Sequence, residues 1–264
     1  MRPPAPLRPS PWLVLPRPNP AARLRLFCFP YAGGGASIFS PWAAKLPPEV
    51  EVAAVQPPGR ENRIGEKPIP DLMELAAQMG VALAPFMDRP FAFYGHSNGG
   101  LMAFELARLL RREGRPEPVL VVTGGRPAPH VEIEGEVIHA LPEAEFHDVL
   151  RRYNGTPDEV LQNAEIMALI SPMLRADFSL GETYHCTPEP PLEMPMAAYG
   201  GMTDGEVPAW SVEAWREHAA GEFRVVMFPG GHFFMNENRD MVLAELTRDL
   251  QGALRRLAGL PAHA

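Results

Sequence analysis

The sequence has little cysteine, no long apolar run and no excess of positive charge, and each shortage excludes a class of protein. Its two cysteines, Cys28 in an apolar run and Cys186 in a polar, proline-rich stretch, show no C-x-x-C spacing, so a reduced cytoplasmic protein is the simpler interpretation. No segment approaches the roughly 20 apolar residues of a membrane span. A net charge of -8 argues against nucleic-acid binding, which usually needs a basic face. We therefore expect a cytoplasmic protein that binds neither nucleic acid nor membrane.

Proline, by contrast, is abundant and is concentrated at the N-terminus. Eight prolines between residues 3 and 20 leave no uninterrupted apolar segment of the length that a signal peptide needs. We predict that residues 1–22 form an extended, proline-rich leader. The rest of the chain has the composition of an ordinary folded domain, with 46% hydrophobic and 21% charged residues over the whole sequence.

After the leader, short apolar runs alternate with segments of helical period, which is typical of an α/β fold with a mostly parallel sheet and helices on both faces. The runs are apolar almost throughout, as strands covered on both faces are. The predicted strands are Leu24–Phe29, Val50–Gln56, Pro90–Tyr94, Val119–Thr123, Pro195–Tyr199 and Phe223–Phe228. The predicted helices between them are Ser37–Lys45, Asp71–Phe86, Gly99–Arg112, Ser211–Ala219 and Glu237–Leu257.

One interval breaks this alternation, because about 70 residues separate the fourth predicted strand from the fifth, far more than an ordinary crossover uses. We call residues 127–192 the insertion, and residues 23–126 and 193–264 the core. A segment of this length must form its own packed layer, and at the carboxyl ends of a parallel sheet it would lie over the site, so we predict a helical lid. Its helical patterns are Glu143–Tyr153, Pro157–Ala168 and Ile170–Leu180.

The pentapeptide Gly95-His96-Ser97-Asn98-Gly99 stands where a predicted strand gives way to a predicted helix. In such a G-x-S-x-G turn the glycines remove side chains that would clash, so the serine can be held in a strained conformation with its hydroxyl exposed. The start of the helix also presents unsatisfied N–H groups to an anion. The motif predicts an activated serine in an α/β-hydrolase fold, with Ser97 as the nucleophile and His96 as support for the turn.

A serine nucleophile needs a histidine base, and the histidine needs an acid; in hydrolases with this turn the chain order is serine, acid, histidine. His232 follows the last predicted strand through a glycine turn, and Asp204 follows the fifth strand in the same way. The other histidines between Ser97 and His232 lie in the insertion or within a helix. Three alternative acids, Asp148, Asp158 and Asp177, also lie in the insertion. We therefore predict the triad Ser97, Asp204 and His232, against the plainer alternatives of a turn aspartate and a packed histidine.

An oxyanion hole needs two backbone donors, one after the nucleophile and one from the loop after an earlier strand. Asn98 supplies the first N–H. The second is predicted to come from Ala32, in the glycine-rich loop that follows the first predicted strand. That loop fits neither G-x-G-x-x-G nor a P-loop with its lysine, which argues against phosphate binding.

Together these motifs resemble the type II thioesterases of the α/β-hydrolase superfamily, the stand-alone editing enzymes of polyketide and non-ribosomal peptide synthases. The resemblance covers the chain from about Leu24 to the C-terminal helix, but not the leader. One departure is Asn98, where the family commonly has methionine; its backbone donor survives, so we expect an effect on selectivity rather than on the chemistry. The matching segments are Phe29–Gly34, Pro58–Glu61 with Arg63, Gly95–Gly100, Tyr199–Gly201 with Asp204, and Phe228–Phe234.

The resemblance implies hydrolysis of acyl or peptidyl thioesters from the phosphopantetheine arm of a carrier protein, through an acyl-enzyme and without metal or organic cofactor. Two alternatives stay open: a carboxylesterase or lipase acting on small oxygen esters, and a thioesterase that releases a cyclised product. A non-catalytic interaction protein on the same scaffold is a third, since fold does not fix function. Residues that could line an acyl channel, although apolar residues at helical spacing in the lid are more often simply core, are Tyr31, Met167, Met173, Phe178 and Phe233.

A carrier protein is generally acidic and brings a phosphate, so we expect a local positive patch at the mouth of the site. Arginines that could form one, although a solvated helix end is the simpler interpretation of the last four, are Arg60, Arg63, Arg108, Arg111, Arg112 and Arg115.

Overall fold

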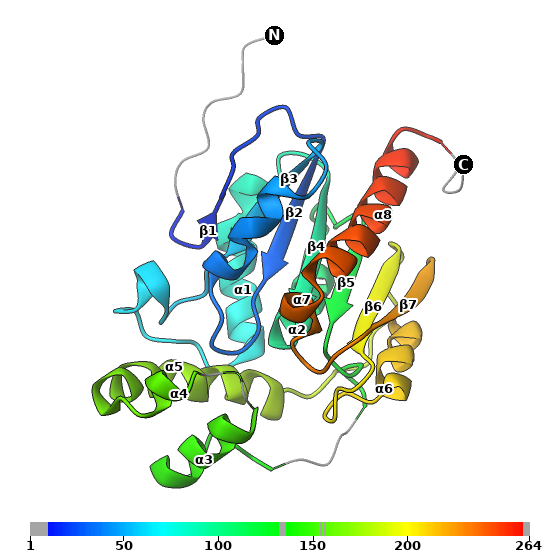
Figure 1. Ribbon diagram of the computed structural model, residues 1–264. Helices are drawn as coiled ribbons and strands as arrows, with labels where there is room; N and C mark the ends of the chain where they lie inside the picture. Colours follow the sequence, from blue (N-terminus) through cyan, green and yellow to red (C-terminus); the bar gives the residue numbers. More distant parts are fainter. Residues whose placement is uncertain (1–9, 132–135, 154, 156, 261–264) are drawn as a thin grey trace.

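Figure 1 shows a computed structural model of the chain, which describes residues 10–131, 136–153, 155 and 157–260. Within these residues seven strands form one sheet in the order β1-β3-β2-β4-β5-β6-β7. Every neighbouring pair is parallel except β1 and β3, which are antiparallel. The strands are β1 (Leu13–Val14), β2 (Leu24–Phe29), β3 (Val50–Val55), β4 (Phe91–His96), β5 (Val121–Gly124), β6 (Met196–Gly201) and β7 (Phe223–Phe228).

The six predicted strands are present, and the structure adds a seventh inside the segment predicted to be a leader. Leu13 and Val14 pair with Val55 and Ala54 at the edge of the sheet, and the Leu13 side chain is buried. A proline-rich segment can take this place because an edge strand needs ladder hydrogen bonds on one side only. The predicted leader is thus extended at these two residues and is also part of the sheet, and residues 1–9 lie outside the described part of the chain.

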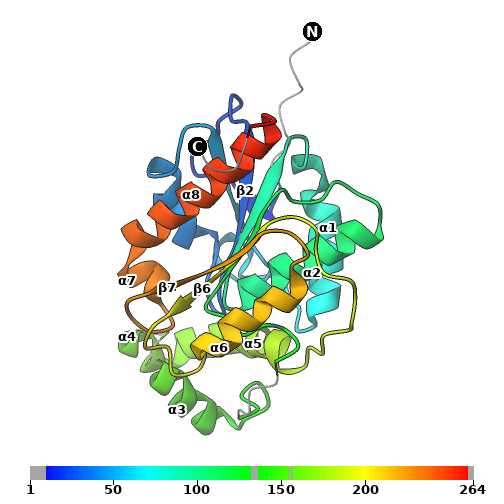
Figure 2. The same ribbon diagram turned by 90° about the vertical axis from the view of Figure 1, so that its right-hand side faces the viewer.

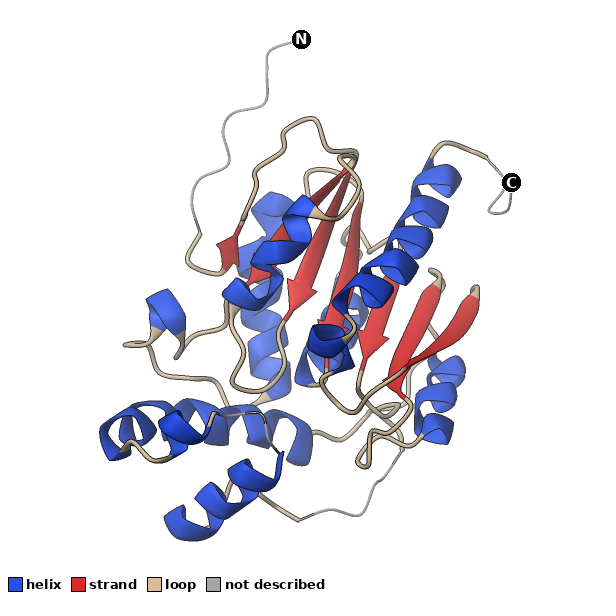
Figure 3. Cartoon of the chain, viewed as in Figure 1, coloured by secondary structure: helices blue, strands red, loops and turns tan. Residues whose placement is uncertain are grey.

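Successive side chains of a strand point to opposite faces of the sheet, so each strand supplies two cores. On one face Phe27 and Phe93 pack with helices α1 (Leu72–Leu83) and α2 (Asn98–Arg112) and with Trp215. On the other face Leu26 and Tyr94 pack with helix α8 (Arg239–Leu257) and with the segment Ala36–Ala44. Figures 2 and 3 show these helices on the two sides of the sheet, as the sequence pattern predicts.

The helices mostly match their predicted positions, with differences at their ends. Ala36–Ala44 is a 3-10 helix that contains Pro41, and the predicted helix Ser211–Ala219 is a short α-helix followed by a 3-10 turn. The α-helices are α1 (Leu72–Leu83), α2 (Asn98–Arg112), α3 (Glu143–Tyr153), α4 (Asp158–Leu161), α5 (Ala164–Glu182), α6 (Ala209–Glu213), α7 (Phe234–Glu237) and α8 (Arg239–Leu257). Among the described residues, no helix has the length and apolarity needed to cross a membrane.

The insertion contains α3, α4 and α5 and has a small core of its own, built on Phe146, Leu150 and Leu174. Helix α3 has the predicted bounds, but α4 is a single turn and α5 is longer than predicted. Asn163 explains the second difference, because its side chain accepts hydrogen bonds from the N–H groups of Glu165 and Ile166 and so starts α5 there. Figure 1 shows the three helices at the end of the sheet to which the parallel strands point.

Candidate active site

Ser97 occupies the sharp turn between β4 and α2 in a strained backbone conformation. Its φ of 54° and ψ of -119° are unusual for a residue with a side chain. The flanking glycines are required sterically, since a Cβ on Gly95 would lie 1.9 Å from the Gly99 oxygen, and one on Gly99 would lie 2.1 Å from the Phe29 oxygen. A hydrogen bond of 2.6 Å from the Ser97 N–H to the Gly124 oxygen ties the turn to β5.

Asp204 and His232 come together at the ends of the neighbouring strands β6 and β7. The His232 Nδ1 lies 2.9 Å from the Asp204 Oδ2, and the Asp204 side chain is almost completely buried. The other carboxylate oxygen accepts hydrogen bonds from the N–H groups of Glu206 and Val207. Burial alone would raise the pKa of the Asp204 carboxyl, but the bonds from His232 and these N–H groups outweigh it and lower the pKa. Asp204 is thus an ionised acceptor that orients the imidazole.

His96 supports the loop that carries His232. Its Nε2 lies 2.8 Å from the backbone oxygen of His232, and because a carbonyl only accepts, this nitrogen carries the proton. Burial, together with the nearby His232 ring, lowers the pKa of His96 to about 3, so the ring is neutral at physiological pH. His96 therefore joins the serine turn to the histidine loop without placing a second cation beside His232.

The glycine-rich loop after β2 forms a turn in which Gly34 donates to the Tyr31 oxygen at 2.9 Å. The Gly33 N–H is also taken, by the Asp177 carboxylate at 2.7 Å. The N–H of Ala32 has no acceptor among the described residues. Asn98 is the first residue of α2, and its N–H lacks a partner within the helix because the first four N–H groups of any α-helix do. Two free N–H groups are thus available on the segments predicted to build an oxyanion hole.

A cavity of about 1200 Å³ brings most of the predicted site residues together. Asp204 lies behind it, bonded to His232. The structure places Met167 elsewhere: it is buried in the insertion's own core and is not part of the cavity wall, which corrects that prediction. Met167 lies six residues before Met173 in α5, so the two side chains leave the helix on different sides. Predicted residues that line the cavity are Tyr31, Ala32, Ser97, Asn98, Met173, Phe178, His232 and Phe233.

Several polar residues of the cavity wall were not predicted, and Arg126, Tyr153 and Glu206 are among them. Arg126 donates to the Asn98 Oδ1 and to the Gly181 oxygen, both at 3.4 Å, and no carboxylate among the described residues pairs with it. Desolvation by the surrounding protein lowers its pKa to about 10, so it remains charged at neutral pH. Its signal in the sequence was a glycine loop directly after a strand, the same setting that singled out Asp204 and His232.

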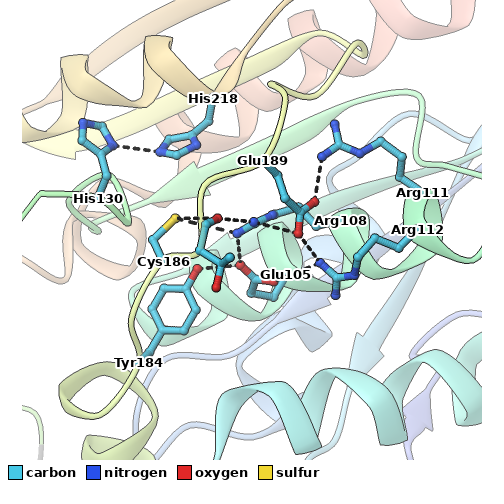
Figure 4. Close-up of polar contacts among 10 residues, drawn as sticks. Glu105, Arg108, Arg111, Arg112, His130, Tyr184, Cys186, Glu189 and His218 are labelled. Carbon is cyan, nitrogen blue, oxygen red and sulfur yellow. Dashed lines mark hydrogen bonds and ion pairs between the residues drawn. The ribbon is translucent and has the colours of Figure 1, made fainter.

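The arginines considered as a positive patch are all engaged in ion pairs. Figure 4 shows Arg108, Arg111 and Arg112 around Glu189, with distances of 2.8, 2.9 and 2.6 Å. Arg108 is buried and also contacts Glu105. The remaining pairs are Arg60 with Asp177, Arg63 with Glu66, and Arg115 with Glu113. These residues hold the chain's own segments together rather than forming a free cationic surface.

Comparisons of the sequence and of the structure with known proteins agree on one family. The thioesterase domain family matches residues 24–250. The gramicidin S biosynthesis protein GrsT of Aneurinibacillus migulanus is 44% identical, over 91% of this chain and 94% of its own. Two solved structures are similar: the type II thioesterase BorB from the borrelidin biosynthetic cluster (TM-score 0.82, 38% identity, 90% of this chain and 97% of that one), and the RedJ thioesterase from the prodiginine pathway of Streptomyces coelicolor (TM-score 0.81, 37% identity, 92% and 94%).

Proposed function

Because the chain belongs to the thioesterase domain family, we propose that it edits a polyketide or non-ribosomal peptide synthase by hydrolysing acyl or peptidyl thioesters from the phosphopantetheine arm of a carrier protein. One observation carries the chemistry: the strained serine turn and the Asp204–His232 pair open into the same cavity. The synthase context rests on the names of similar proteins: GrsT is a gramicidin S biosynthesis protein, and BorB is a type II thioesterase from the borrelidin biosynthetic cluster.

In the proposed reaction His232 removes the Ser97 proton while Ser97 attacks the thioester carbonyl carbon. With its Nδ1 bonded to Asp204, the imidazole has Nε2 available for that proton. The N–H groups of Ala32 and Asn98 stabilise the oxyanion, and each such donor typically contributes about 3 kcal/mol. Collapse of the intermediate expels the thiolate, which takes the proton from His232 and leaves as the thiol. Water, activated by the same histidine, then releases the acid and restores Ser97.

We further propose that the insertion acts as a lid that shapes the acyl channel. Its residues Met173 and Phe178 line the cavity, and a Cβ on Gly155 would lie 3.0 Å from the Phe233 ring beside His232. The insertion therefore lies close to the reacting groups, where it can exclude water and select the acyl chain. The carrier protein itself would remain outside, with only its arm and acyl group in the cavity.

The test is a panel of acylated carrier proteins followed by intact-protein mass spectrometry, with Ser97→Ala as the inactive control. We expect the wild type to return the free carrier and the variant to leave it acylated. Paired assays on N-acetylcysteamine thioesters and matched oxygen esters distinguish the esterase alternative, which predicts equal or faster turnover of the oxygen esters. A chain whose Ser97 does not react with a fluorophosphonate would instead be a non-catalytic interaction protein.

A further inference from the structure

Asp177, in helix α5 of the insertion, contacts both segments that carry the proposed oxyanion donors. Its carboxylate accepts the Gly33 N–H at 2.7 Å, directly after Ala32, and its backbone oxygen accepts the Asn98 side-chain amide at 2.5 Å. The residue is 1% exposed. We propose that Asp177 is a positioning residue that sets the geometry of the oxyanion hole and makes that geometry depend on the docking of α5. This inference rests on the proposed function.

The contact with Gly33 fixes the orientation of a peptide that could otherwise rotate. Gly33 has a φ of 77°, and with the bond from Gly34 to Tyr31 this describes a turn whose third residue must be glycine. This is the pattern of a type II turn. Type II and the commoner type I turns differ by rotation of the central peptide, here the one between Ala32 and Gly33. A carboxylate at 2.7 Å from its N–H selects one orientation, and an ionised acceptor makes that bond stronger than a neutral one.

Arg60 holds the Asp177 carboxylate in place and grips the same turn. Its two terminal nitrogens lie 2.8 Å from the two carboxylate oxygens, and one of them also donates to the Gly34 oxygen at 3.0 Å. Both partners are buried. The ion pair thus binds one N–H and one carbonyl of the turn, so neither peptide can rotate independently of α5.

The second contact depends on the side-chain amide of Asn98. The Asn98 amide donates to the Asp177 backbone oxygen, whereas the methionine that type II thioesterases commonly have at this position has no N–H to donate. Asn98 is the first residue of α2, and its side chain therefore links the helix start that carries one oxyanion donor to the helix that orients the other.

The consequence is that α5 must be docked for both donors to be in place. A cavity open to solvent, with α5 displaced, would keep Ser97, Asp204 and His232 but would lose the hydrogen bonds that hold the two segments carrying these N–H groups. Removing a single oxyanion donor typically lowers kcat by about 100- to 1000-fold, and misplacing one should cost part of that factor.

The experiment compares Asp177→Asn and Asp177→Glu with Glu51→Gln as a matched control. Glu51 is also a buried carboxylate in an ion pair with an arginine, but it lies at the start of β3, away from the cavity. The readouts are kcat and KM on one acyl thioester, the free energy of unfolding, and the affinity for a trifluoromethyl ketone analogue. Ser97 adds to that ketone, its proton passes to His232, and the ketone oxygen becomes an oxyanion.

We expect Asp177→Asn to lower kcat and the ketone affinity together, by roughly 10- to 100-fold, with KM changed by less than about threefold. Asp177→Glu keeps the charge that Arg60 needs but displaces the carboxylate from Gly33, so it should fold and show the same paired loss. Glu51→Gln should lose stability while keeping both kcat and ketone affinity. Wild-type ketone affinity in a folded Asp177→Glu would overturn the inference, as would equal losses in the control.

These results separate this inference from the proposed function. If the wild type fails to hydrolyse every acyl-carrier thioester in the panel, the proposed function is wrong whatever the variants do. If the wild type is active and labels at Ser97, but the Asp177 variants bind the ketone normally, only the role of Asp177 is wrong.

Discussion

His96 predicts a specific loss of stability in acid. Its ring is buried and neutral, with a pKa lowered from 6.5 to about 3 by burial and by the nearby His232. In the unfolded chain the imidazole is exposed and titrates near 6.5. Between these two values the unfolded state binds a proton that the folded state does not, so stability is fully present above pH 6.5 and is lost as the pH falls toward 3.

The magnitude follows from the gap between the two pKa values. Lowering the pH by one unit within that gap removes about 1.4 kcal/mol from the free energy of unfolding. The loss reaches about 2 kcal/mol at pH 5 and about 5 kcal/mol at pH 3. The perturbation is His96→Gln, because the glutamine amide can replace the Nε2–H that donates to the His232 oxygen yet cannot titrate.

The assay is urea unfolding of wild type and variant at pH 8 and pH 5. We expect the wild type to lose about 2 kcal/mol more than His96→Gln over this interval, since that part of the loss belongs to His96 alone. His96→Ala serves as the control for the hydrogen bond: it should share the flat pH response but be less stable at pH 8, because it leaves the His232 oxygen without its partner. If the unfolding free energies of wild type and His96→Gln fall by the same amount from pH 8 to pH 5, His96 does not titrate as its burial implies.

Three further predictions concern the serine turn, the Glu189 cluster and Asn98. Gly95→Ala should abolish thioester hydrolysis, since its Cβ would lie 1.9 Å from the Gly99 oxygen, whereas Gly65→Ala, with no atom within 4 Å of the new Cβ, should keep wild-type kcat; an active Gly95→Ala would mean that the turn can relax. Glu189→Gln should lower the free energy of unfolding by roughly 1.5–3 kcal/mol, because the charged acceptor shared by Arg108, Arg111 and Arg112 is lost. Burial would raise the pKa of Glu189, but the three arginines lower it to about 2, so its contribution should hold above pH 4.5 and fade below; unfolding at pH 7 and pH 3 checks this. Asn98→Met removes a hydrogen bond and adds apolar surface at the cavity wall, so the profile over acyl chains from short to long should shift toward apolar chains; an unchanged profile contradicts a role of Asn98 in selectivity.

The positions of six strands and of the insertion along the chain could be predicted because they depend on patterns within single segments. Six apolar runs gave six strands with errors of at most about two residues at the ends, the usual uncertainty of helix and strand limits. The edge strand could not be predicted, since Leu13 and Val14 form a strand only through their pairing with β3. Tertiary contact overrode a local sequence rich in proline.

The site shows the same division. Asp204 and His232 could be placed because each follows a strand through a glycine turn, and parallel strands end at the same edge of the sheet. Asp177 could not: it was set aside as an acid of the insertion, and nothing in its helix indicates a contact with Gly33, which lies 144 residues away in sequence. Met167 was assigned to the cavity for the opposite reason, because helical spacing does not distinguish the side of a helix that faces a cavity from the side that faces a core.

Two of the buried arginine–carboxylate pairs among the described residues, Arg25–Glu51 and Arg60–Asp177, bear on what such pairs do. Replacing a buried ion pair by apolar residues is often neutral or stabilising, so stability alone explains neither. Arg25, paired with Glu51, also donates to the Phe86 oxygen and to Asp88, and so fastens the connection that leads into β4. Arg60 and Asp177 instead bind a carbonyl and an N–H of the turn that carries Ala32. If pairs of this kind are retained for the backbone groups that they orient, breaking the first should change unfolding only, whereas breaking the second should change the binding of an oxyanion. Equal effects on both quantities would assign the two pairs the same structural role.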